Sequence, residues 1–68
     1  MQSGIVKYFS EERGFGFIKP DGCSRDLFFH IRECTPLGYM PERGVRVSFE
    51  IGDDERTGKQ MAVRVEMA

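Results

Sequence analysis

The sequence predicts an all-β fold in which five short antiparallel strands close into a small barrel. Segments of four to eight residues rich in Val, Ile, Phe and Tyr alternate with turn clusters at short intervals. Nowhere do apolar residues recur with helical spacing across three turns. Five strands in so short a chain would leave unpaired edges, and closing the sheet removes them. A five-stranded antiparallel Greek-key barrel of the OB-fold type is the economical solution.

Length and charge limit what such a barrel can do. With 68 residues, the chain is expected to form one domain over residues 1–68, with a thin core. Ten basic and eleven acidic side chains give a net charge of −1, so non-ionic contacts must supply much of any affinity for nucleic acid. No apolar run is long enough to cross a membrane, and no basic-then-apolar leader is visible. We therefore expect a cytoplasmic protein without a membrane partner.

The residues that could support metal binding or catalysis are few. Cys23 and Cys34 lack the Cys-x-x-Cys spacing, and the single histidine cannot complete a usual zinc site. Without an export signal we expect two reduced thiols rather than a disulfide. No nucleophile–base pair or phosphate-binding loop is visible, so we expect neither an enzyme nor a cofactor or small-molecule substrate.

The first strand is expected over residues 3–9, and its alternation is awkward. Strict alternation would place Lys7 on one face with Ile5 and Phe9. A bulge near Lys7 or Tyr8 would resolve this by re-aiming one side chain. The sequence alone does not determine which face of the sheet the side chains of Tyr8 and Phe9 occupy.

The second and third strands, expected over residues 13–19 and 26–30, carry the most informative pattern. A polar turn at 10–12 precedes the second, and Pro20-Asp21-Gly22 is a strong turn signal before the third. Alternation directs one set of side chains to the core: Gly14, Gly16, Ile18, Leu27 and Phe29. The opposite face then carries four rings, which so small a chain cannot also bury: Phe15, Phe17, Phe28 and His30. Exposed rings near Arg13 and Lys19 suit the stacking of bases.

The rest of the chain gives an irregular segment and two further strands. Residues 31–44 contain Pro36, Gly38, Pro41 and Gly44 and allow at most one helical turn; loops of this length are often functional. The cleanest strand spans residues 45–51, with Val45, Val47, Phe49 and Ile51 expected inward. After a charged connection, the last strand, residues 59–66, sets Met61, Val63 and Val65 against Ala62, Arg64 and Glu66.

The hexamer Arg-Gly-Phe-Gly-Phe-Ile at 13–18 matches the start of the first ribonucleoprotein motif of RNA-recognition domains. That domain needs two helices behind a four-stranded sheet, and the sequence predicts neither. Pro20 also stands where the motif has its last aromatic. A barrel can present the same aromatic residues on an exposed sheet face without needing the helices.

Together with Leu-Phe-Phe-His at 27–30 and Val-Lys-Tyr-Phe at 6–9, the hexamer resembles the pattern of bacterial cold-shock proteins. The Gly44-x-x-Val47-x-Phe49 run and residues 60–65 extend the resemblance to residues 3–66. The resemblance implies an antiparallel five-stranded barrel that binds single-stranded RNA and DNA. We also expect a monomer, and binding with low sequence specificity because stacking tolerates any base. The resemblance also implies an RNA chaperone, with roles in cold adaptation or in regulating transcription or translation.

The resemblance assigns a binding surface to ten residues: Lys7, Tyr8, Arg13, Phe15, Phe17, Asp26, Phe28, His30, Tyr39 and Arg56. Three departures from the family pattern stand out. Tyr8 replaces the usual tryptophan, and Ile31 stands where an aromatic usually follows the histidine. The connection at 53–59 is about one residue longer, which affects Arg56. We expect weaker binding than in a typical member, in the same mode.

Structural alternatives remain open for several of these residues. Tyr39 is also compatible with a loop anchor, and Asp26 either fixes a strand end or accepts a hydrogen bond from a base edge. His30 also suits a purely structural hydrogen bond, and Lys7 and Arg13 suit plain solvated charges. The phenylalanines could instead belong to the core, or form an interface with a second copy or a protein partner.

Overall fold

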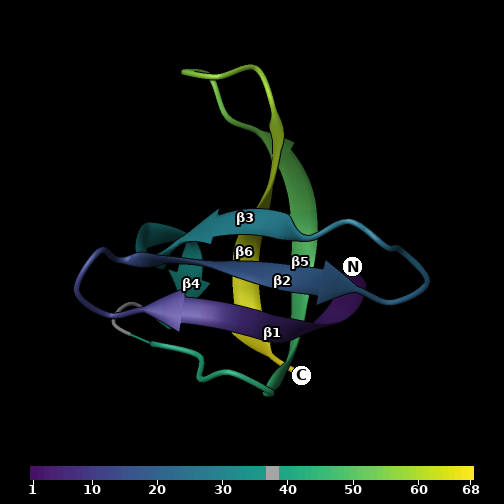
Figure 1. Cartoon of the computed structure of the whole chain (residues 1–68), viewed down its shortest axis with the longest axis vertical. Coiled ribbons are helices and arrows are strands. Elements are labelled where there is room, and N and C mark those ends of the chain that lie inside the picture. Colours follow the sequence, from purple (N-terminus) through teal and green to yellow (C-terminus); the bar gives the residue numbers. More distant parts are fainter. Residues whose placement is uncertain (37–38) are drawn as a thin grey trace.

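The computed structural model describes residues 1–36 and 39–68, and its strands belong to one sheet (Figure 1). The expectation for residues 31–44 falls partly on residues 37 and 38, which lie outside the described residues. The elements are β1 (Gln2–Ser10), β2 (Phe15–Pro20), β3 (Leu27–His30), the 3₁₀ turn η1 (Ile31–Glu33), β4 (Cys34–Thr35), β5 (Arg46–Asp53) and β6 (Gln60–Met67). The described residues contain no α-helix, which confirms the all-β prediction.

The strand order is β3-β2-β1-β5-β6-β4, and β3 also pairs with β6. This last pairing, a parallel bridge between Phe29 and Ala62, closes the five long strands into the predicted barrel. In Figure 1, β1, β2 and β3 cross in front of β5 and β6. The sequence did not predict β4, a two-residue strand that runs parallel to β6 and places Cys34 opposite Val65.

The second strand starts later than expected, at Phe15 rather than Arg13. The Gly14 N–H donates to the Ser10 carbonyl (2.8 Å), and the Arg13 N–H donates to the Ser10 hydroxyl (3.2 Å). Gly14 has φ +74°, a left-handed conformation that glycine adopts without a steric penalty. Arg13 and Gly14 therefore close the turn between β1 and β2.

The predicted bulge in β1 is confirmed, and it centres on Lys7. Val6 pairs with Ile18 and Tyr8 with Phe17, so Lys7 is one extra residue facing a continuous β2. Val6 points into the core, while Lys7 and Tyr8 are both exposed. The chain then resumes alternation with the opposite phase.

This change of phase settles the facing of Phe9. Phe9 turns back toward the core, where its ring stacks on Phe29 at 5.9 Å between centroids and 9° between planes. Tyr8 is left on the outer face. The bulge thus separates two adjacent aromatic residues onto opposite sides of the sheet.

A second bulge in β6 breaks the alternation expected there. Ser48 pairs with Glu66 and Glu50 with Val63, so Arg64 and Val65 together face Phe49. Arg64 has φ +52°, unusual for a side-chain-bearing residue and typical of such irregularities. Ala62 and Val65 are both buried as a result, whereas Met61 and Val63 are only half-buried.

Among the described residues, eight buried hydrophobic residues form the core cluster: Val6, Ile18, Phe29, Cys34, Val47, Phe49, Ala62 and Val65. Phe9, Leu27, Tyr39 and Val45 pack against it. The core assignment of Phe29 and Phe49 is confirmed, whereas Leu27 is only half-buried and packs against the core. The inward placement of Ile51 is wrong: its side chain is 42% exposed, because β5 and β6 continue beyond the barrel there (Figure 1).

Gly16 allows β2 to lie close to the core. A methyl group at Gly16 would collide with the Tyr8 carbonyl and come within 2.9 Å of the Phe29 ring. Because the obstacles are backbone and a buried ring, the sheet would have to move. Gly22, in the next turn, has open space but φ +73°.

We expect Gly16→Ala to lower the free energy of unfolding by about 3 kcal/mol through overpacking. Gly22→Ala is the matched control, with a cost of about 1 kcal/mol from backbone strain alone. Urea unfolding curves of the two variants measure the difference. Equal midpoints would show that β2 has no such close contact.

The two cysteines are free thiols in different surroundings, Cys23 exposed and Cys34 buried. Burial, with a smaller contribution from the Glu33 carboxylate, raises the pKa of the Cys34 thiol from 9.0 to about 11. The folded state therefore holds this proton more tightly than the unfolded chain does.

This shift predicts a pH dependence of stability. The contribution from Cys34 is fully present below pH 9 and is lost as the pH rises through 11. We expect the wild-type protein to lose more stability between pH 8.5 and 11 than Cys34→Ala, which has no thiol to ionise. Thermal unfolding of both proteins across this range checks it, and parallel curves would contradict it.

Candidate nucleic-acid interface

Four aromatic rings form a continuous layer on the outer face of β1, β2 and β3: Tyr8, Phe15, Phe17 and Phe28. We call this layer the ring platform. Tyr8 pairs with Phe17 across β1 and β2, and Phe17 pairs with Phe28 across β2 and β3. Cross-strand partners lie on the same face, which brings the rings together. Neighbouring centroids are 5.7–6.4 Å apart, in tilted and edge-to-face arrangements.

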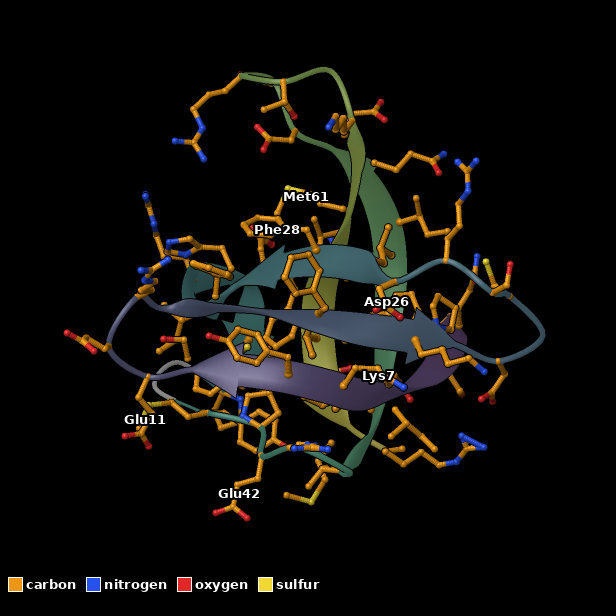
Figure 2. All side chains as sticks on the ribbon, viewed as in Figure 1. Lys7, Glu11, Asp26, Phe28, Glu42 and Met61 are labelled. Atoms are coloured by element: carbon orange, nitrogen blue, oxygen red, sulfur yellow. The ribbon has the colours of Figure 1, made fainter. Side chains whose placement is uncertain are left out.

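The ring platform lies outside the core. Its three phenylalanines are half-buried and belong to no part of the core cluster, and Tyr8 is 47% exposed. Their strand neighbours Gly16, Ile18 and Phe29 are the residues that point inward. The rings bury one another's edges and leave part of their surface to solvent. Figure 2 shows Phe28 among these rings on β3.

His30 lies at one end of the platform, opposite Phe15 across β2 and β3. Its Nδ1 accepts the backbone N–H of Arg32 at 3.1 Å, and this bond caps η1. A neutral imidazole with an acceptor at Nδ1 carries its proton on Nε2. The ring is therefore fixed structurally and still offers a donor.

Cationic side chains border the platform without forming a dense patch. Lys7 is exposed at the β1 bulge, and Arg13 is exposed in the turn before β2. In Figure 2, Lys7 on β1 and Asp26 near the start of β3 lie toward the same side of the rings. Asp26 shares a groove with Phe17, Phe28 and the 54–60 connection.

The connection between β5 and β6 places Arg56 beside the edge of the ring platform. Asp54 accepts the Arg56 backbone N–H at 2.9 Å, and its carboxylate lies 3.8 Å from the Arg56 Nε. This turn holds Arg56 along grooves that Phe28 also lines. The guanidinium side chain is 82% exposed, so it remains accessible.

A groove of about 250 Å³, which we call the side groove, runs between β3, η1 and the β5–β6 connection. It is lined by Phe28, His30, Arg32, Glu33, Asp54, Arg56 and Met61. Figure 2 shows Met61 beside Phe28. Sequence reasoning missed Arg32, Glu33, Asp54 and Met61 as site residues. Simple alternation along the last strand places Met61 on the same face as Val65, which is buried. The bulge in β6 moves Met61 to the opposite face, and no glycine in the sequence marks the position of that bulge.

Tyr39 is not brought to the ring platform. Its ring packs against the core, and its hydroxyl is buried without a hydrogen-bond partner among the described residues. Burial, together with the nearby Cys34 and Glu42, raises the pKa of this hydroxyl. Ile31, at the position of an expected aromatic, is half-buried, and its N–H donates to the Gly14 carbonyl (2.8 Å).

Metal-ligand clusters and membrane-spanning helices were also sought among the described residues. Across residues 1–36 and 39–68, no group of three or more His, Cys, Asp or Glu side chains converges on a possible metal position. None of the helical structure in this part of the chain has the length and apolarity to span a membrane.

Comparison with known proteins agrees with this geometry. The family model of the 'Cold-shock' DNA-binding domain matches residues 2–68. A probable cold shock protein A of Mycobacterium tuberculosis is 40% identical over 65 residues, covering 94% of this chain and 97% of its own. A probable cold shock protein, y4cH, of Sinorhizobium fredii is 40% identical over 63 residues, covering 91% of each chain.

A solved structure gives the same fold at low sequence identity. The Drosophila Unr CSD456 structure superposes with a TM-score of 0.79 at 22% identity, covering 98% of this chain and 26% of that one. The family match and the relatives extend over nearly the whole chain, as the sequence motifs predicted. This chain belongs to the cold-shock domain family.

Proposed function

We propose that residues 1–68 act as one cold-shock domain that binds single-stranded RNA or DNA and works as a cytoplasmic RNA chaperone. Cold-shock domain proteins are nucleic-acid-binding proteins rather than enzymes, and the family assignment supports binding in this general sense. The proposed form is a monomer that needs no cofactor. The ring platform is the observation that supports single-strand binding by base stacking and the chaperone activity.

The platform suits unpaired bases because it offers several flat apolar rings in one layer. Bases would stack on Phe15, Phe17 and Phe28, with Tyr8 and His30 at the margins. Stacking contributes about 1–3 kcal/mol per base and tolerates any sequence, since every base has a π-face. Tyr8 in place of a larger ring, and Ile31 in place of an aromatic, would make this binding weaker than in a typical family member.

Such a surface discriminates against duplexes, whose base faces are already stacked on one another. Binding the open strand preferentially shifts a hairpin toward its melted form. The required free energy comes from binding itself, so no nucleotide hydrolysis is needed. This is the sense in which we propose a chaperone activity.

Charged and loop residues take supporting roles in this proposal. Lys7, Arg13 and Arg56 would neutralise phosphates along the strand, and Asp26 would accept a hydrogen bond from a base edge. Because Tyr39 packs against the core, we propose that it anchors its loop instead of stacking on a base.

We expect Phe28→Ala to weaken binding of a fluorescein-labelled hexathymidine about tenfold, the equivalent of one lost stacking contact. Met67→Ala, which truncates a 67% exposed residue at the end of β6, is the control and should bind like the wild type. Fluorescence anisotropy gives the affinities, with a matched duplex as the non-binding reference.

Urea unfolding of the same variants separates binding from folding. Phe28→Ala should remain folded, because Phe28 lies outside the core cluster. Unchanged affinity would contradict the proposal, as would equal binding of the duplex. A mass that rises with concentration, in the absence of oligonucleotide binding, would instead identify the platform as a protein interface.

The dependence of affinity on salt tests the ionic part separately. With three or four phosphates neutralised, log Kd plotted against log salt concentration should change with a slope of magnitude roughly 2–3. Lys7→Gln should reduce this slope by about 0.7, the value for one single-strand contact. Arg64→Gln removes one charge paired with Glu50 away from the platform and should leave the slope unchanged. If Lys7→Gln and Arg64→Gln reduced the slope by the same amount, Lys7 would have no specific role in phosphate binding.

A further inference from the structure

The side groove holds hydrogen-bonding groups that stacking alone would not use. It is continuous with the ring platform because Phe28 forms part of both. A strand lying on the platform would therefore pass the mouth of the groove. Its volume of about 250 Å³ lies just below the range for drug-sized ligands, which suits one planar base.

The groove combines apolar walls with donors and acceptors. Phe28 and Met61 supply the apolar surface, and a methionine sulfur packs well against flat aromatic groups. The donors are the Arg32 and Arg56 guanidinium groups and the Nε2–H of His30. The two carboxylates, Asp54 and Glu33, supply the acceptors.

These two carboxylates differ in their availability. Asp54 is only 16% exposed, and its Oδ1 already accepts the Arg56 backbone N–H. Glu33 is half-buried and, within the described part of the chain, has no ion pair and no side-chain hydrogen bond. Glu33 is therefore the acceptor that the groove offers to a ligand.

We propose that the side groove selects a guanine base from a strand bound on the ring platform, with Glu33 as the specificity-determining residue. A carboxylate accepts two parallel donors in the same way that it accepts the fork of an arginine. Guanine is the only standard base with two adjacent donors on its Watson–Crick edge, N1–H and the N2 amino group. Its O6 then accepts from the cationic donors in the same groove. This inference rests on the proposed function and adds a base preference to it.

The test uses hexauridylate and a series in which each uridine in turn is replaced by guanosine or by inosine. Inosine keeps N1–H and O6 but lacks the N2 amino group. We expect guanosine at one position to tighten binding about tenfold, the value of a good bidentate contact, and inosine there to lose most of the gain. The inosine comparison needs no protein variant.

Glu33→Gln and Glu42→Gln form a matched pair, since each removes one negative charge. Figure 2 shows Glu42 at the opposite edge of the molecule from Met61. Glu33→Gln should reduce the guanosine preference to within about twofold, well under one bidentate contact, whereas Glu42→Gln should keep it. For each variant, the affinity for the guanosine-containing hexamer is divided by the affinity for hexauridylate. This ratio cancels any general effect of the lost charge on binding.

Three results would overturn the inference: equal affinity for all hexamers, equal effects of guanosine and inosine, or a preference that survives Glu33→Gln. If hexauridylate binds but any of these three results is obtained, only the guanine preference fails and the proposed function stands. If hexauridylate does not bind, or a duplex binds equally well, the proposed function fails and this inference falls with it.

Discussion

The packing of Phe29 beneath Gly16 is the constraint on which the rest of the structure depends. With no side chain at position 16, β2 lies directly over a buried ring, and the barrel interior is filled by a few residues. An interior this small has no room for further aromatic rings from the same strands. Phe15, Phe17 and Phe28 therefore remain on the outer face, where a larger protein would cover them. The site and the core are two consequences of one packing arrangement.

Two bulges adapt this simple alternation to a closed barrel. The extra residue at Lys7 turns Tyr8 outward to join the ring platform and Phe9 inward onto Phe29. The irregularity at Arg64 buries Ala62 and Val65 and leaves Met61 beside Phe28, where it lines the side groove. Each bulge changes the phase of one strand, so a single added residue alters both the core and the surface.

The sequence predicted the barrel, the bulge in β1 and the face on which the rings lie, because alternation is a local property of each strand. It did not predict the later start of β2, the exposure of Ile51 or the short strand β4. These depend on where the sheet closes and how far β5 extends past the barrel, which only tertiary packing decides. The sequence also did not predict the bulge at Arg64, because no glycine in β6 marks its position. The position of Tyr39 against the core rather than at the platform likewise follows from the path of a long loop.

We propose that the outer rings, and not the core, contact unpaired bases. Aromatic ¹³C–¹H spectra of the protein titrated with hexathymidine test this most directly, because bound bases shift the resonances of the rings they cover. Binding of bases on the outer face predicts large shifts for Phe15, Phe17 and Phe28 and small ones for the buried rings of Phe29 and Phe49. Spectra in which none of the three outer rings moves, or in which the strand perturbs only residues of β5 and β6, would contradict it.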